Sequence, residues 1–275
     1  MIRLRYAMLW LFFSAVLINV PATAVEPIRL RVLSYNIHHA EGVDRKLDLE
    51  RIARVIRSVS PDLVALQEVD QSVKRSSSVD QPAELARLTE MQVAFGKNIE
   101  LQGGGYGNAI LSRHPITRQQ NHPLPNFEHG EQRGLIEAEI AVPGLNAPLL
   151  FLATHLDHRS DDRERLASAA AINELIGTRP DQPAILAGDL NDGPESATLH
   201  RFKLQWTRAN DRPQPTIPVV KPSRQIDFVL VRPRARWNTI EVRVLDEPVA
   251  SDHLPILAVL DLLPETPAAA QGASQ

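Results

Sequence analysis

Polar clusters in this chain lie inside or directly after apolar runs that have the composition of buried β-strands. Their side chains are carboxylates, amides and imidazoles: Asn36; Gln67 and Glu68; Thr154 and His155; Asp189 and Asn191; Asp227; and Ser251, Asp252 and His253. A buried carboxylate is unfavourable unless it is paired with a positive charge or a metal. Because this occurs at so many strands, we predict that the clusters meet at one site.

The segment 184–194, AILAGDLNDGP, shows how one cluster is built. Its apolar run ends on Gly-Asp-x-Asn and breaks at Gly-Pro, which is typical of a buried strand with polar residues at its carboxyl end. Asp189 and Asn191 would share one side of the strand, because strand side chains alternate. A carboxylate beside an amide can hold a water or a phosphoryl oxygen near a hard cation. The segment also resembles part of a calcium loop, but the downstream glutamate of such a loop is absent.

The donor types indicate which metal would bind. Carboxylates and amides in a chain without cysteine favour Mg²⁺, Mn²⁺ or Ca²⁺. A zinc site from His38 and His39, or from His155, Asp157 and His158, is the alternative. It is less favoured, because these histidines have neither the i, i+4 helical spacing nor the cysteine partners of typical zinc motifs.

The elements that must position these residues are mostly strands. Apolar runs and alternation predict strands at 30–37, 62–68, 106–112, 136–142, 149–154, 184–190, 226–231, 239–244 and 254–262. Helical spacing predicts helices at 47–59, 83–91 and 163–176. Strands outnumber helices, and the helices occur singly between strands. This pattern favours two packed sheets flanked by helices, in one domain spanning 27–263.

The two ends of the chain differ in composition from this domain. Residues 1–24 combine Arg3 and Arg5, an apolar stretch and a small-residue cleavage site before Val25, which predicts a secretory signal peptide. An uncleaved membrane anchor is the alternative, but the apolar stretch is short for a spanning helix. Residues 264–275 are rich in Ala, Gln, Ser, Thr and Pro, so we predict a disordered tail. The protein is therefore expected to be exported, either to a periplasm or outside the cell.

Charge and cysteine content narrow the possible partners. Removal of Arg3 and Arg5 would leave 28 basic against 33 acidic residues, a mature net charge of −5. The chain has no run of Lys or Arg and only 13 aromatic residues, which gives little support for a nucleic-acid groove without excluding a nuclease. It has no cysteine, so the exported domain would fold without disulfides. We expect a monomer.

Seven motifs occur in the order found in the endonuclease/exonuclease/phosphatase family, which has the DNase I-like fold. Together they resemble that family from Val32 to Leu260, although each one alone would be weak. The motifs are SYNIHH, LQEVD, YGNAILSRHPI, THLDH, AGDLND, QIDFVLV and SDHLPI. The resemblance implies an α/β fold of four layers, with two mixed sheets packed face to face and helices outside them.

The resemblance also implies roles for eight of these residues. Asn36, Glu68 and Asp252 would hold a divalent metal, normally Mg²⁺. The catalytic residues would be His155, Asp189, Asn191, Asp227 and His253. Asp189 would orient or deprotonate the attacking water, and Asn191 would position that water or a phosphoryl oxygen. Asp227 would orient His253, and both histidines would contact the phosphate. The leaving-group acid and the presence of a second metal stay open.

Each of these residues also has a structural explanation. Asn36 and Asp252 occur in places typical of turn or cap residues, and Glu68 could lie on a solvated edge. His155 alone is more often structural than catalytic. Arg133 has two interpretations: it would either face the substrate or form a surface ion pair with an acidic neighbour. Further possible substrate contacts are His38, His39, Arg113, His114, Asp157, His158 and Arg159.

We therefore predict an exported, metal-dependent phosphoesterase that hydrolyses a phosphodiester or phosphomonoester. A small or lipid-linked substrate is the leading hypothesis, because the shared motifs bind the phosphate and the charge gives little support for nucleic acid. A secreted endonuclease is one alternative. A non-catalytic binding protein on the same fold is another, although no aligned catalytic position is substituted.

Overall fold

The computed structural model describes residues 26–127 and 130–265. The predicted signal peptide, 1–24, lies outside the described residues, as does nearly all of the predicted tail. No helix in the described ranges is long and apolar enough to span a membrane.

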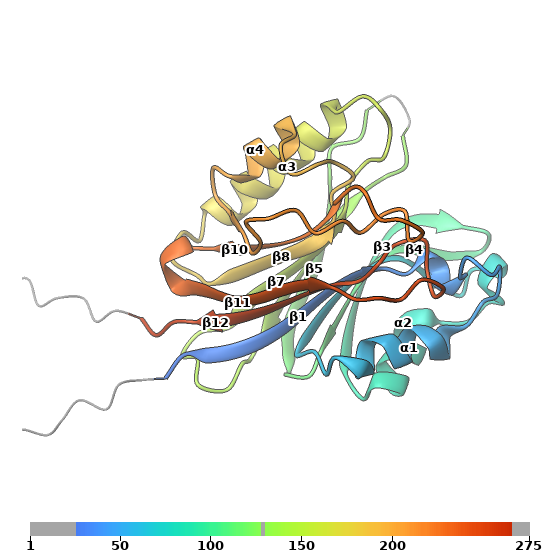
Figure 1. The fold of residues 1–275 in the computed structure, drawn as a ribbon, viewed down its shortest axis with the longest axis horizontal. Coiled ribbons are helices and arrows are strands. Elements are labelled where there is room, and N and C mark those ends of the chain that lie inside the picture. Colours follow the sequence, from blue (N-terminus) through green and yellow to red (C-terminus); the bar gives the residue numbers. More distant parts are fainter. Residues whose placement is uncertain (1–25, 128–129, 266–275) are drawn as a thin grey trace, which may run out of the picture.

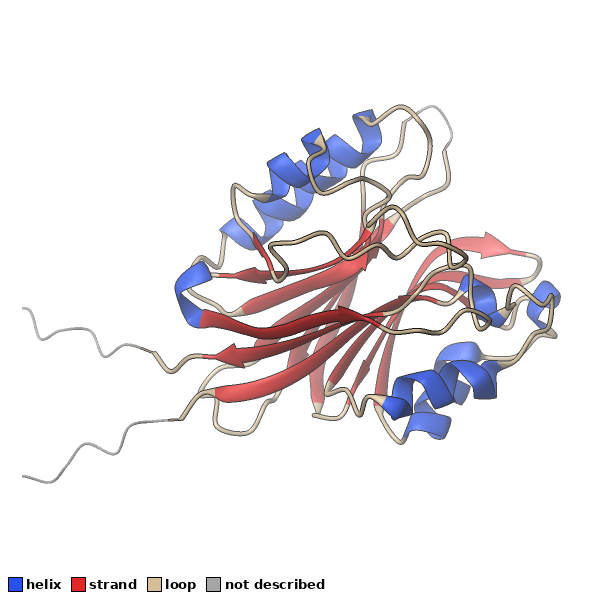
Figure 2. Ribbon diagram, in the orientation of Figure 1, coloured by secondary structure: helices blue, strands red, loops and turns tan. Residues whose placement is uncertain are grey.

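Two six-stranded mixed sheets make up the centre of the molecule (Figures 1 and 2). The first sheet has the strand order β11 (Trp237–Val244), β12 (Ile256–Leu262), β1 (Ile28–Asn36), β2 (Leu63–Gln71), β4 (Gly104–Ser112) and β3 (Gln92–Leu101). The second has the order β5 (Ile116–Pro123), β6 (Gly134–Ile140), β7 (Leu149–His155), β8 (Ala184–Asp189), β10 (Asp227–Arg232) and β9 (Thr207–Arg208). The parallel pairs are β1 with β2 and β7 with β8.

Helices cover the outer face of each sheet, so the predicted four-layer sandwich is confirmed. Helices α1 (Leu49–Ser58) and α2 (Gln81–Thr89) pack on the first sheet, and α3 (Arg163–Gly177) and α4 (Ala197–Phe202) on the second (Figure 1). Asp48 caps α1 through Arg51 N (2.8 Å), and its apolar residues Ile52 and Ile56 recur every four positions on the buried face.

Three apolar clusters fill the spaces between the four layers. Alternate residues of a strand face opposite sides of its sheet, so Leu30 and Val32 of β1 enter the cluster between the sheets, while Leu33 and Tyr35 face the helices. In the second sheet, Ile185 and Ala187 of β8 face the other sheet. The polar residues that continue these inward-facing rows therefore emerge between the sheets at one edge of the sandwich.

Strand β2 departs from the prediction in a way that matters for the site. It does not end at Glu68 but continues to Gln71, and its pairing with β4 shifts between Leu66 and Val69. Glu68 has φ +58° at this bulge. One extra residue in β2 interrupts the alternation, which redirects the Glu68 side chain without ending the strand.

Strands β3, β5 and β9 and helix α4 have no counterpart among the predicted elements. Strand β5 reads ITRQQNHP and is mostly exposed at the sheet edge, so it lacks the apolar alternation on which the prediction depends. Helix α4 has only six residues, too few to show a helical period. The turn between β3 and β4 is formed by Gln102 and Gly103, and Gly104 and Gly105 already belong to β4.

Candidate active site

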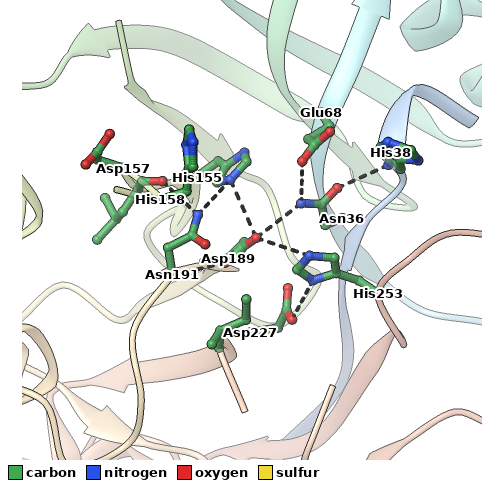
Figure 3. Close-up of polar contacts among 12 residues, drawn as sticks. Asn36, His38, Glu68, His155, Asp157, His158, Asp189, Asn191, Asp227 and His253 are labelled. Carbon is green, nitrogen blue, oxygen red and sulfur yellow. Dashed lines mark hydrogen bonds and ion pairs between the residues drawn. The ribbon is translucent and has the colours of Figure 1, made fainter. Parts of the chain in front are cut away.

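The strand ends of both sheets bring the predicted polar residues together. Asn36 ends β1, and His155 and Asp189 end the neighbouring strands β7 and β8. Asp227 begins β10 and pairs in register with Asp189. All four continue the inward-facing rows of their strands, and Figure 3 shows their side chains converging with Glu68, Asn191 and His253.

Asp189 lies at the centre of this group. Its Oδ2 accepts a hydrogen bond from Asn36 Nδ2 (3.1 Å) and lies 3.5 Å from His155 Nε2 and 3.7 Å from His253 Nε2. Its Oδ1 accepts from the backbone N–H of Asn191 (2.9 Å). The carboxylate is almost fully buried, and one oxygen therefore faces groups from three other strands or loops.

The environment of Asp189 makes it a proton acceptor near neutral pH. Burial, with Asp227 second, raises the pKa of Asp189 to about 7, although His253, Asn191 and Asn36 act in the opposite direction. A carboxylate with a pKa near the working pH is suited to general base catalysis.

His253 is held as a cation. Its Nδ1 donates to Asp227 Oδ2 (2.9 Å), and that oxygen also accepts from the Thr216 hydroxyl (2.6 Å). Burial lowers the pKa of His253, but Asp227 and Asp189 outweigh burial and raise it to about 10. The imidazolium keeps its second N–H, on Nε2, directed toward Asp189 (Figure 3). This agrees with the predicted pairing of Asp227 with His253.

Burial and the neighbouring Arg133 hold His155 as the neutral form, and the contact with Arg133 was not predicted from the sequence. Arg133 is almost fully buried; its guanidinium donates to His155 Nδ1 (3.2 Å) and to His158 Nδ1 (3.2 Å), and it pairs with Glu131 (2.7 Å). Burial, together with Arg133, His253 and His158, holds the pKa of His155 well below its usual range. Arg133 is thus in an ion pair with Glu131, as one of the two sequence interpretations predicted, but it is buried rather than on the surface.

Both ring nitrogens of His155 lie beside donor groups. The Arg133 guanidinium can only donate, so Nδ1 of His155 accepts from it. Asn191 Nδ2 lies 2.9 Å from Nε2 and donates to the Leu156 carbonyl (3.0 Å). Nε2 is the ring nitrogen that faces Asp189.

Glu68 and Asn36 form the other half of the site. Asn36 Nδ2 donates to Glu68 Oε1 (3.0 Å) as well as to Asp189, so its amide joins the two carboxylates. In the described part of the chain, no lysine or arginine forms an ion pair with Glu68. A half-buried carboxylate without a basic partner fits a divalent cation. Asn36 would have to rotate its amide to offer oxygen to that cation, because its Oδ1 accepts from His38 N (3.1 Å).

A second group of possible metal ligands is Asp189, Asp227 and His253, whose ligand atoms lie within 4.8 Å of one another. This group could hold a metal if His253 gave up a proton. As the structure stands, the ring is hydrogen-bonded to Asp227 and charged, so its nitrogens are donors. Glu68 is therefore the better anchor for a cation.

The remaining predicted residues lie at various distances from this centre. Asp252 is exposed, and its carboxylate is linked to the site through Ser251, whose hydroxyl binds the Asn36 carbonyl (2.7 Å); its metal role stays a prediction. Asp157 binds Arg159 (3.0 Å) beside the site. Arg113 pairs with Asp62 (3.0 Å), just before the start of β2, so Arg113 and the adjacent His114 lie away from the strand ends that carry the site.

Comparison with known proteins agrees with this geometry. The chain is 30% identical over 247 residues to the uncharacterized protein YbhP of Escherichia coli K12, covering 84% of this chain and 96% of YbhP. It is 25% identical over 176 residues to a 5'-tyrosyl-DNA phosphodiesterase of Caenorhabditis elegans, covering 62% of this chain and 45% of that protein. The crystal structure of an endonuclease/exonuclease/phosphatase from Beutenbergia cavernae matches with a TM-score of 0.72 and 27% identity, covering 86% of this chain and 72% of that one.

The family model for the Endonuclease/Exonuclease/phosphatase family matches residues 33–253, from the second half of β1 to His253. That span contains every catalytic and metal-binding residue predicted above. The chain therefore belongs to the endonuclease/exonuclease/phosphatase family, whose members are phosphoester hydrolases.

Proposed function

We propose that this protein is an exported, divalent-metal-dependent enzyme that hydrolyses a small or lipid-linked phosphodiester or phosphomonoester by in-line attack of water. The observation that carries the proposal is the position of Asp189. Its carboxylate lies within 3.1 to 3.7 Å of Asn36, His155 and His253, which come from different strands and loops.

Asp189 supplies the base in this mechanism. Water attacks phosphorus opposite the leaving oxygen, Asp189 Oδ2 takes its proton, and the P–O bond breaks with the electron pair on the leaving oxygen. The backbone N–H of Asn191 holds Oδ1 at 2.9 Å, which leaves Oδ2 as the oxygen that faces the reacting groups.

The two histidines stabilise the negative charge that develops on the phosphoryl oxygens. His253 provides a charged donor through Nε2, and the neutral ring of His155 also faces Asp189 through its Nε2. Donors fixed in place before the reaction lower the barrier, because they need not reorganise as charge develops. A divalent cation at Glu68 would neutralise a further part of this charge.

A cavity beside the site supports a small substrate group. It has a volume of about 350 Å³ and is lined by Phe127, His158, Arg159, Ser160, Asp161, Arg163 and Glu164. His158 links the cavity to the site, since it shares the Arg133 guanidinium with His155. Its mixture of an aromatic ring with charged groups suits a polar or amphiphilic alcohol rather than a long polymer.

Export rests on the sequence of residues 1–24. Cell fractionation, followed by N-terminal sequencing of the exported protein, tests it. We expect a mature chain that begins at Val25; an intact Arg3 and Arg5 in the membrane fraction would instead identify an anchor.

The catalytic proposal is tested with a panel of phosphoesters. The purified protein is assayed with Mg²⁺ or with EDTA on aryl phosphodiesters and monoesters, phospholipid vesicles, sugar phosphates and plasmid DNA. We expect Mg²⁺-dependent turnover of a small or lipid-linked ester, and at least a 100-fold loss of kcat in Asp189→Asn. Asp181→Asn, which changes an exposed aspartate, is the matched control and should keep full activity.

The same panel separates the two alternatives. Nicking of plasmid in preference to small esters would identify a nuclease; a substrate that contains DNA is consistent with the similarity to the 5'-tyrosyl-DNA phosphodiesterase of Caenorhabditis elegans. No turnover of any ester, with a biological activity that survives both Asp189→Asn and His253→Gln, would identify a binding protein.

A further inference from the structure

We propose that His38, His39 and Glu68 bind one divalent cation of the transition series, such as Mn²⁺ or Zn²⁺. One ligand atom from each residue lies within 4.8 Å of those of the other two. Atoms that share a metal at about 2.0–2.2 Å lie at most about 4 Å apart, so only small side-chain movements are needed to close the site. This pair of histidines has no part in the mechanism described above.

His38 already has the hydrogen bond that a metal-binding histidine needs. Its Nδ1 lies 3.0 Å from the carbonyl oxygen of Glu41. Because a carbonyl can only accept, Nδ1 carries the ring proton and Nε2 keeps a free lone pair. A backbone carbonyl bound to the far ring nitrogen is the usual device that orients a histidine ligand and makes it more basic.

His39 supplies an unsatisfied donor atom. The residue is only 8% exposed, and its Nδ1 is buried without a hydrogen-bond partner. A buried polar atom with no partner is destabilising and rare, and it calls for an explanation such as an absent ion. A cation that reached this nitrogen would satisfy it.

The backbone holds both rings together. His38, His39 and Ala40 have φ values of +45°, +43° and +65°, an unusual run of left-handed residues without glycine. The turn is kept by hydrogen bonds from His38 N to Asn36 Oδ1 (3.1 Å) and from Gln81 Nε2 to the His39 carbonyl (2.7 Å). The two ring centroids lie 4.6 Å apart. The rings are thus positioned before any cation arrives.

Glu68 is the third proposed ligand, and it is also the residue expected to anchor Mg²⁺ in the active site. Its Oε1 accepts from Asn36, and among the described residues no side chain is bonded to its other oxygen. Two imidazoles with one carboxylate favour Mn²⁺, Zn²⁺ or a similar ion over Mg²⁺, which prefers oxygen ligands. The proposed site therefore shares Glu68 with the magnesium half of the active site and differs from it in metal preference.

The first test is Co²⁺ titration, followed by visible absorption and calorimetry, since these measure binding without turnover. We expect one tightly bound Co²⁺ whose absorption bands show nitrogen ligands, displaced by Zn²⁺. His38→Gln and His39→Gln should each weaken binding at least 10-fold. His200→Gln, which removes an exposed histidine on α4, should bind as the unmodified protein does.

A second measurement does not depend on the folding of variants. Histidine modification by diethyl pyrocarbonate, read by mass spectrometry on the unmodified protein, should be suppressed by Zn²⁺ at His38 and not at His200. Equal modification of His38 with and without Zn²⁺ overturns the proposal, as does unchanged Co²⁺ affinity in the double variant His38→Gln/His39→Gln. Absence of phosphoester turnover would leave both binding measurements unaffected, so the two proposals fail separately.

Discussion

Asp227 is hydrogen-bonded to His253 and lies opposite Asp189 in the β8–β10 pair. The proposed reaction depends on the charge of both. The Asp227 carboxylate raises the pKa of both Asp189 and His253. In the proposed mechanism Asp189 is ionised, above a pKa of about 7, and His253 is protonated, below a pKa of about 10. The profile of kcat/KM against pH should therefore rise near pH 7 and fall near pH 10.

Asp227→Asn should move both limbs of this profile to lower pH, because the carboxylate that raises both pKa values is lost. It should also lower kcat about 100-fold, since His253 loses its orienting acceptor. The measurement is a profile from about pH 5 to 10.5, with Asp181→Asn as the control. Limbs that stay in place would contradict the assignment of Asp189 and His253.

Arg133→Gln tests whether the guanidinium holds His155 neutral. Because Arg133 lowers the pKa of His155, its removal should raise that pKa, and kcat should fall about 10-fold at slightly acidic pH. NMR titration of the His155 ring measures the pKa directly. Arg118→Gln, which breaks an exposed ion pair with Glu139, is the control. A purely structural role for Arg133 would leave the titration of the folded variant unchanged.

At the residue scale, the sequence was enough to predict which residue types form the site, but not which side chains contact one another. The residue types of Asp189, Asp227 and His253 and their places beside apolar runs were enough to group them, and their distances agree. The contact of Arg133 with His155 was missed because it joins residues 22 positions apart, which no local pattern pairs. The orientation of the Asn36 amide depends on His38 and two acids at once, which no local pattern encodes.

At the scale of the elements, the β7–β8 pair is the contact that fixes the catalytic spacing. His155 and Asp189 face each other in register at the end of this parallel pair. One residue earlier, a Cβ on Gly188 would collide with the carbonyl oxygen of Thr154. Only glycine lets the two strands approach this closely.

Gly188→Ala should therefore force β7 and β8 apart. We expect a loss of about 1–3 kcal/mol in the free energy of unfolding and a fall in kcat, because His155 and Asp189 separate. Chemical denaturation and steady-state kinetics measure the two effects. Gly193→Ala is the control, because a Cβ at that position would have nothing within 4 Å of it, and it should change neither quantity.

The bulge at Glu68 is a feature of the strands that the sequence did not predict. An apolar run identified β2, but an inserted residue leaves no trace in composition, so the strand was expected to stop at Glu68, where it only changes direction. Continuously apolar strands such as β8 and β10 were predictable because both of their faces are buried. The polar edge strand β5 was not, because its pairing with β6 rather than its side chains makes it a strand.

At the scale of the whole molecule, cation binding should stabilise the fold. A ligand present at about 100 times its dissociation constant adds about 2.7 kcal/mol, provided that it binds only the folded state. Mg²⁺ should therefore raise the Tm of the unmodified protein by about 5–10 °C, and EDTA should reverse the effect.

Glu68→Gln should lose most of the Mg²⁺-dependent rise in Tm, because the cation loses its anchoring carboxylate. His38→Gln/His39→Gln should keep that rise, since oxygen ligands carry magnesium binding. Differential scanning calorimetry with and without Mg²⁺ measures both. An equal rise in the unmodified protein and in Glu68→Gln would place the magnesium elsewhere.

The side chains proposed to bind the phosphate come mostly from strand ends, whereas the neighbouring cavity is lined by Phe127 and by the segment 158–164, which leads into α3. Substitutions at 158–164 can thus alter which alcohol is accepted while the paired sheets keep the spacing around Asp189. If the proposed activity holds, descendants of this protein could therefore acquire new substrates through few mutations, and the hydrolytic step would be inherited unaltered.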